Sequence, residues 1–175
     1  MLYIHCTGKL AKVAGIVLEP RPGQSDLLRI DLWYANWIGF TDTENAVLFT
    51  NPGCLYTFLM PVPGGSLRFF AVIAQFRAKL HEALLSLGAS KACVEHVSAS
   101  HAQYVTCKTA SRSVLGSMNE MAFSVDAYMN WEAADNQIPS VTDIEEKLNQ
   151  IPLSAIGYNF PIERFRELIT TLPQS

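Results

Sequence analysis

Apolar and polar residues follow two different periods along this chain. Short runs rich in apolar and β-branched residues, some of them alternating with polar residues, end at glycine, proline or asparagine turns. This pattern is typical of β-strands. The runs cover residues 2–6, 28–40, 46–50, 55–62 and 103–109. The runs at 28–40 and 46–50 are separated by a polar turn and are predicted to form a hairpin.

Other stretches place apolar residues three and four positions apart, which predicts helices with one buried face. These stretches cover residues 66–87, 90–99, 111–131, 143–150 and 162–172. The 143–150 helix is predicted to start at a Thr142 cap with Glu145 as its capping-box partner. The adjacent Glu145 and Glu146 are read as a solvated helix start.

The order of these elements predicts an α+β fold. We expect a mostly antiparallel sheet of about four or five strands, with the helices packed on one face. A chain of 175 residues is long enough to bury ~70% of its unfolded surface as one unit. We therefore predict a single domain over residues 1–175.

The helix over 111–131 has an unusual start. Arg112 lies at the positive end of the helix dipole, where a cation is misplaced. Free helix amides and a guanidinium can together hold a phosphate or carboxylate; alternatively, Arg112 pairs with a carboxylate elsewhere or points into water. Ser111 or Ser113 is expected to cap this end. Gly116 costs about 1 kcal/mol relative to alanine, which favours a close backbone approach there.

Several polar residues stand within apolar surroundings and form a candidate pocket. Asn119, for example, is expected on or beside the apolar stripe of its helix. No acid or histidine is among these residues, so they suit binding better than proton transfer. The alternative is a buried hydrogen-bond network that ties the hairpin to the 111–131 helix. The candidate ligand-binding residues are Arg112, Ser113, Asn119, Trp33, Tyr34, Asn36, Asn51 and Tyr158.

The aromatic residues of this set belong to a cluster at 33–37. Trp33, Tyr34 and Trp37 place three rings within five residues. Such rings can form a platform on which bases or sugars stack. They can equally pack in the core or at a subunit interface.

Four segments occur in an order that resembles a known family. They are Trp-Tyr-Ala-Asn at 33–36, Val-Leu-Phe-Thr-Asn at 47–51, Ser-Arg-Ser-Val-Leu-Gly-Ser-Met-Asn at 111–119 and Ile-Pro-Leu-Ser-Ala-Ile-Gly-Tyr at 151–158. Together they are similar to an uncharacterised bacterial domain family, a domain of unknown function. The resemblance spans nearly the whole chain and implies one domain of bacterial or mobile-element origin. It implies no activity and no catalytic residue.

Composition narrows the possible partners. Only 17% of the residues are charged against 49% hydrophobic, which leaves room for an exposed apolar patch, and so for a homo-oligomer or a protein partner. The net charge of −3 argues against a broad nucleic-acid footprint, although not against a local nucleic-acid or phosphate site.

Cysteine and histidine spacing gives no metal motif. The scattered Cys6, Cys54, Cys93 and Cys107 are predicted to be buried free thiols in a reducing cytoplasm. No cofactor motif is present, so no metal and no cofactor is predicted. The first residues lack the pattern of a signal peptide, and no apolar run reaches the ~20 residues that span a bilayer. We therefore expect a cytoplasmic protein with no membrane contact.

Three functions remain. The first is a non-catalytic binding or interaction module, which the low charge and the lack of an acid–base group favour. The second is an RNA- or nucleotide-binding protein, such as a ribonuclease-type component of a toxin–antitoxin or phage-defence system. Arg112 and the aromatic rings at 33–37 favour this function. The third is a small-molecule enzyme whose site assembles in space.

Overall fold

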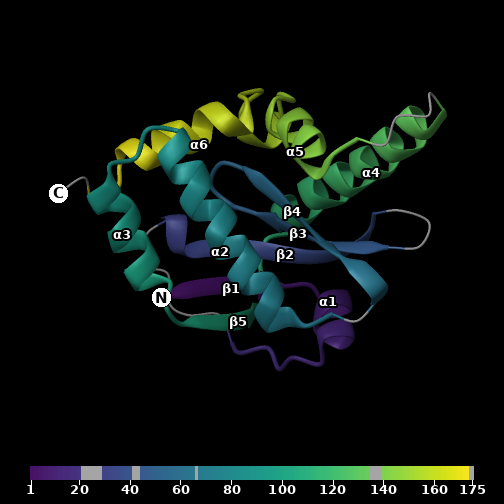
Figure 1. The fold of residues 1–175 in the computed structure, drawn as a ribbon, viewed down its shortest axis with the longest axis horizontal. Coiled ribbons are helices and arrows are strands. Elements are labelled where there is room, and N and C mark those ends of the chain that lie inside the picture. Colours follow the sequence, from purple (N-terminus) through teal and green to yellow (C-terminus); the bar gives the residue numbers. More distant parts are fainter. Residues whose placement is uncertain (21–28, 41–43, 66, 135–138, 174–175) are drawn as a thin grey trace.

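Five strands form one sheet that organises the described part of the chain (Figure 1). The structure is a computed structural model that describes residues 1–20, 29–40, 44–65, 67–134 and 139–173, and of residues 130–134 only the backbone. Leu28 and most of the polar turn of the predicted hairpin lie outside these residues. The strands are β1 (Leu2–Cys6), β2 (Leu32–Gly39), β3 (Asn45–Thr50), β4 (Thr57–Val62) and β5 (Tyr104–Lys108).

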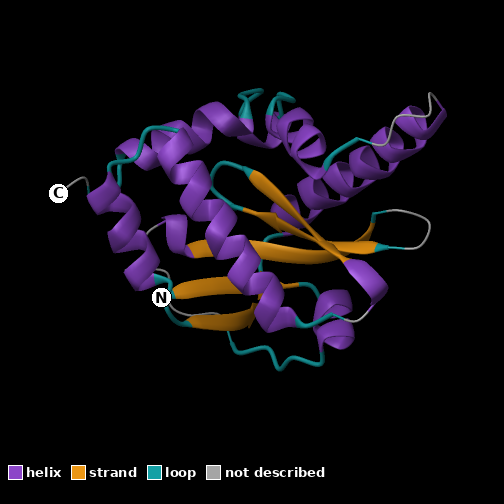
Figure 2. Ribbon diagram, viewed as in Figure 1, coloured by secondary structure: helices purple, strands orange, loops and turns teal. Residues whose placement is uncertain are grey.

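Six α-helices accompany the sheet within the described residues (Figure 2). They are α1 (Gly8–Ala14), α2 (Phe69–Ser86), α3 (Lys91–Ser100), α4 (Arg112–Ala134), α5 (Val141–Asn149) and α6 (Pro161–Thr170). Short 3₁₀ turns are η1 (Arg29–Asp31), η2 (Pro63–Gly65) and η3 (Ser154–Ile156). No helix in these described ranges has the length and apolar character needed to cross a membrane.

The sheet is mixed, with the order β4-β3-β2-β1-β5. β1 lies in the middle of the parallel part and pairs with β2 and β5. The longer ladders, β2 with β3 and β3 with β4, are antiparallel. The predicted α+β fold, its hairpin and its mostly antiparallel sheet are therefore confirmed.

Helices cover both faces of the sheet, which corrects the prediction of a single covered face. Trp33, Ala35 and Trp37 of β2 point to a core with α2, α3 and α6. Tyr34 and Ile38 point to a second core with α4 and α5. The reason is visible in the central strands, whose successive residues are buried on both sides. Strands that are apolar on both faces need a helical layer on each.

The helix caps differ in part from the prediction. Ser111 caps α4, since its Oγ accepts a hydrogen bond from the Val114 amide at 3.3 Å. In α5, however, Ser140 is the cap and Asp143 closes the capping box, not Thr142 and Glu145. Both pairs match the S/T-x-x-D/E spacing, so the pattern alone does not choose between them. Because Asp143 makes the capping box, the Glu145 carboxylate is not used by the cap and bonds Leu59 and Lys79 instead.

Candidate functional site

The eight predicted site residues separate into an internal group and a surface group. Trp33, Tyr34 and Asn51 are buried, and Asn36 is half-buried. The other four, Arg112, Ser113, Asn119 and Tyr158, are exposed. Only the exposed side chains are therefore accessible to a ligand from solvent.

Trp33 is part of the core and offers no face to a ligand. Its ring centroid lies 5.0 Å from that of Phe76, 5.6 Å from Phe58 and 6.2 Å from Phe165. The indole Nε1 donates a 2.8 Å hydrogen bond to the Ile30 carbonyl. Of the two interpretations of the 33–37 rings, core packing is the one that the structure bears out, since Tyr34 and Trp37 are also buried.

Tyr34 and Asn36 tie β2 to the helices that follow the parallel strands. The Tyr34 ring stacks on His5 with centroids 4.9 Å apart, and its hydroxyl accepts a 3.1 Å hydrogen bond from the Ser111 amide. Asn36 Oδ1 accepts a 2.9 Å bond from the Thr7 hydroxyl, which also caps α1. These contacts fix the starts of α1 and α4, as the hydrogen-bond alternative predicts.

Asn51 holds the turn between β3 and β4. Its Nδ2 donates to the carbonyls of Arg29 at 2.9 Å and Leu32 at 3.2 Å. Its Oδ1 accepts from the amides of Gly53 at 2.9 Å and Cys54 at 3.3 Å. A side chain with both ends occupied in this way has a structural role.

The exposed candidates lie on one face of α4. Arg112, Ser113 and Asn119 are exposed on the side opposite the buried residues Val114, Met118, Met121 and Val125. Asn119 is thus exposed beside the apolar stripe, next to the half-buried Leu115 and Ala122 that border the second core. Arg112 makes no ion pair with any described residue and reaches into solvent.

Two further residues, neither among the eight predicted ligand-binding residues, share this face of α4. Phe123 is 75% exposed, although it lies in the middle of a long helix. A Cβ placed on Gly116 would meet nothing within 4 Å. The close backbone approach expected at Gly116 is therefore not made by any residue that the structure describes. Gly116, which has no side chain, and the exposed ring of Phe123 therefore lie two turns apart on one face of α4.

Tyr158 stands on the rim of a groove beside the same helix. The groove has a volume of about 400 Å³ and is lined by Glu120, Met121, Ser124, Leu148, Ile151, Pro152, Leu153, Ser154 and Tyr158. Tyr158 is 75% exposed and has φ of 59°, a conformation that residues with a side chain rarely adopt. Its backbone is held there by a 2.9 Å bond from its amide to the Leu153 carbonyl.

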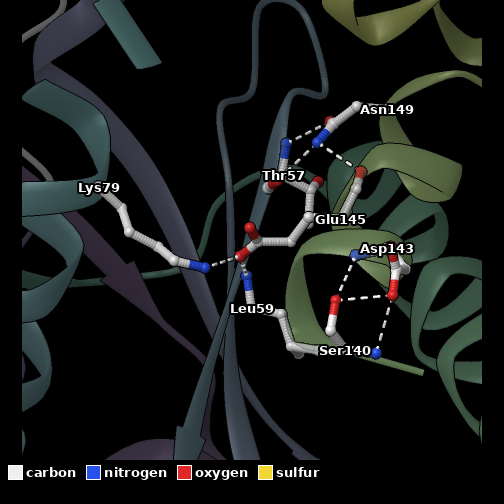
Figure 3. A network of polar contacts seen from close by, with 7 residues as sticks. All are labelled: Thr57, Leu59, Lys79, Ser140, Asp143, Glu145 and Asn149. Atoms are coloured by element: carbon white, nitrogen blue, oxygen red, sulfur yellow. Dashed lines mark hydrogen bonds and ion pairs between the residues drawn. The ribbon is translucent and has the colours of Figure 1, made fainter. Parts of the chain in front are cut away.

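A second polar centre was missed by the sequence prediction. Glu145 Oε1 accepts 2.6 Å hydrogen bonds from Lys79 Nζ and from the Leu59 amide (Figure 3). One turn further along α5, Asn149 exchanges two 2.8 Å bonds with the Thr57 backbone. The only signal in the sequence is the i, i+4 spacing of Glu145 and Asn149 next to the apolar Ile144 and Leu148.

These contacts close the outer edge of β4. In its ladder with β3, the amides of Thr57 and Leu59 point away from the sheet, and the next such position is Pro61, which has no amide hydrogen. Both outward amides are therefore bonded by α5 side chains, which prevents pairing of this edge with another strand. A cleft of about 330 Å³ adjoins these contacts. Its lining residues include Tyr56, Lys79 and Glu145, and the bond between Lys79 and Glu145 fixes two of them.

Burial raises the pKa of Glu145, although the bonds from Lys79 and Leu59 act against that rise. A folded-state pKa above the unfolded value contributes stability at low pH that is lost as the pH rises through it. We therefore compare the free energy of unfolding of the wild type with that of Glu145→Gln. The difference should decrease as the pH rises above 4.5, the usual pKa of glutamate. Urea unfolding of both proteins across this range measures it. Glu146→Gln, the same change at the exposed neighbouring position, is the matched control.

The thiols are unsuited to nucleophilic catalysis. All four cysteines are free and buried, as predicted. Burial raises the pKa of Cys6 and of Cys54 to about 12, and also raises the pKa of Cys93 and Cys107. A thiol rather than a thiolate is then present at neutral pH. Among the residues that the structure describes, no group of three histidine, cysteine or acidic side chains could hold a metal ion.

Comparison with known proteins places the chain in a family. The model of a family described as a domain of unknown function (DUF6933) matches residues 3–164. No curated protein and no solved structure matches the chain. The match covers β2 to β5, β1 except for Leu2, and the whole of α4.

Proposed function

The chain belongs to this family of unknown function, DUF6933, and we propose that it is a non-catalytic binding module that pairs with a second copy of itself through the exposed face of α4. The observation that carries the proposal is the combination of Phe123, 75% exposed, with Gly116, where an added Cβ would meet nothing within 4 Å. A glycine in a helix costs stability and is retained where another backbone comes close. Nothing within the described chain makes that approach.

The spacing on α4 favours an antiparallel two-fold pair. Gly116 and Phe123 are seven residues apart, two helical turns, and lie on the same line of the helix surface. When two copies of α4 cross about a centre near Asn119, Phe123 of each copy lies over Gly116 of the other. Such an isologous contact uses the same patch twice and closes at two subunits.

Charge at the ends of the patch supports the same orientation. Arg112 precedes Asn119 by seven residues and Asp126 follows it by seven, and all three are exposed. In an antiparallel pair, each Arg112 faces the Asp126 of the other copy. A parallel pair would instead bring two Arg112 side chains together, which is unfavourable. The exposed Tyr158 beside Glu120 extends the patch beyond the helix.

The proposed pair predicts opposite effects of one substitution on stability and on association. Gly116→Leu should raise the free energy of unfolding of the monomer by up to about 1 kcal/mol, because leucine favours a helix and finds open space there. The same side chain should block the partner helix. Sedimentation velocity from low-micromolar to millimolar protein should show a dimer for the wild type and a monomer for Gly116→Leu and Phe123→Ala. A wild type that stays monomeric throughout contradicts the proposal.

Two control experiments separate this contact from a general effect of surface changes. Phe70 on α2 is 72% exposed, and Phe70→Ala should leave the dimer unchanged. Arg112→Glu and Asp126→Arg should each weaken it through like-charge contacts, whereas the double variant should restore it. Failure of the double variant to do so would exclude the antiparallel orientation.

The proposal also includes location. We propose a cytoplasmic protein, because four buried free thiols suit a reducing compartment.

A further inference from the structure

A small cavity between α2 and α3 is lined by an arginine, Arg77, that forms no ion pair with any described acid. Its volume is about 160 Å³, and it is lined by Arg77, Leu80, His81, Leu84, Val97, Ser98, His101 and Ala102. In this set, the buried Leu80, Leu84 and Val97 form an apolar part, whereas His81, Ser98 and Ala102 are exposed at the mouth. The cavity lies on the opposite face of the sheet from α4.

Arg77 packs on an aromatic ring, but two of its nitrogen atoms lack hydrogen-bond partners. Its guanidinium lies over the Tyr104 ring, with Cζ 5.5 Å from the ring centroid. Its Nε and Nη2 are buried and have no hydrogen-bond partner among the described residues. A guanidinium carries five N–H donors, and leaving buried donors unbonded is unfavourable, the more so for a charged group. The site therefore lacks an acceptor.

The nearby carboxylate does not supply that acceptor. Asp31 accepts a 2.7 Å bond from His101 Nε2 and a 3.2 Å bond from the Ser100 hydroxyl, both at Oδ1. Asp31 forms no ion pair with Arg77, and neither does any other described acid. No acid in the described part of the chain therefore compensates the positive charge of Arg77, which lies beside the apolar part of the cavity.

We propose that this cavity binds a small aliphatic carboxylate. The carboxylate group would accept hydrogen bonds from the Arg77 guanidinium, which matches the geometry of a planar two-oxygen acceptor. Its short alkyl chain would lie against Leu80, Leu84 and Val97. The apolar wall and the small volume favour such a molecule over inorganic phosphate, which has no apolar part. Butyrate is of suitable size and is the probe that we choose.

Titration of the folded protein with butyrate, followed by amide NMR, tests the site. We expect saturable shifts at the amides of Leu80, Leu84, Val97 and Ala102. Butyramide has the same shape without the charge and should bind at least about tenfold more weakly, as should inorganic phosphate. Absence of saturable shifts with butyrate, or equal binding of butyramide, would overturn the proposal. Equal or tighter binding of phosphate would also overturn the choice of an aliphatic carboxylate.

Substitutions locate the binding within the cavity. Arg77→Gln should weaken butyrate binding by at least about tenfold, while Arg166→Gln, at an exposed arginine of α6, should not change it. Should Arg77→Gln fail to fold, Ala102→Leu fills the mouth from an exposed position and leaves Arg77 intact. It too should abolish the shifts. Unchanged binding by either folded cavity variant would show that butyrate binds elsewhere.

Discussion

Replacing Trp33 by alanine is expected to lower the free energy of unfolding by about 3–5 kcal/mol, as for other fully buried large aromatic residues. Trp33 has 0% exposure and contacts three phenylalanine rings from β4, α2 and α6. Its removal leaves a cavity at the centre of one core and also deletes the bond to Ile30. Since a domain has only about 5–15 kcal/mol of net stability, chemical denaturation should show a large loss of the native state.

Two matched variants separate burial from aromatic character. Phe70→Ala removes an aromatic ring that is 72% exposed and should change stability by no more than about 0.5 kcal/mol. Trp33→Phe keeps a ring in the core but leaves the buried Ile30 carbonyl without its 2.8 Å bond, which costs about 1–3 kcal/mol. A Trp33→Ala protein as stable as the wild type would mean that position 33 is not in the core.

The strands and most helices could be predicted because their periodicity reports burial directly. The 46–50 run is apolar at the consecutive positions 46–49 and forms β3, an interior strand of the sheet. These consecutive apolar residues also explain why helices cover both faces of the sheet and not one, because neighbours such as Val47 and Leu48 point to different cores. Strand order and the parallel pairing of β1 depend on long-range contacts that a local pattern does not contain.

Site prediction was limited by the ambiguity of polar residues. Asn51 and Asn119 are the same residue type in similar apolar surroundings in the sequence, yet one has 0% exposure and the other is exposed. Helical periodicity placed Met118 and Met121 correctly on the buried stripe of α4. It could not say which residues of the opposite face, such as Phe123, remain uncovered. The adjacent Glu145 and Glu146 predict a solvated helix start, but the helix begins two residues earlier and Glu145 bonds β4.

Replacing Asn51 by alanine should cost several kcal/mol in the free energy of unfolding, because each buried group left unbonded costs about 1–3 kcal/mol. The Asn51 amide bonds the carbonyls of Arg29 and Leu32 and the amides of Gly53 and Cys54. It also stabilises a turn in which Leu55 has φ of 58°, a conformation that is unfavourable for leucine. Denaturant unfolding of Asn51→Ala measures the loss, and Asn119→Ala should change stability by no more than about 0.5 kcal/mol.

Asn51→Asp tests the direction of these bonds without changing the shape of the side chain. An aspartate still accepts from Gly53 and Cys54, but its negative charge faces two carbonyl oxygens that formerly received N–H groups. Burial and this repulsion raise the folded-state pKa of the new carboxyl, so its protonated form is favoured in the fold. The variant should therefore lose stability as the pH rises from mildly acidic to neutral. Equal stability of Asn51→Asp at both pH values would mean that Asn51 is open to solvent, as a ligand-binding residue would be.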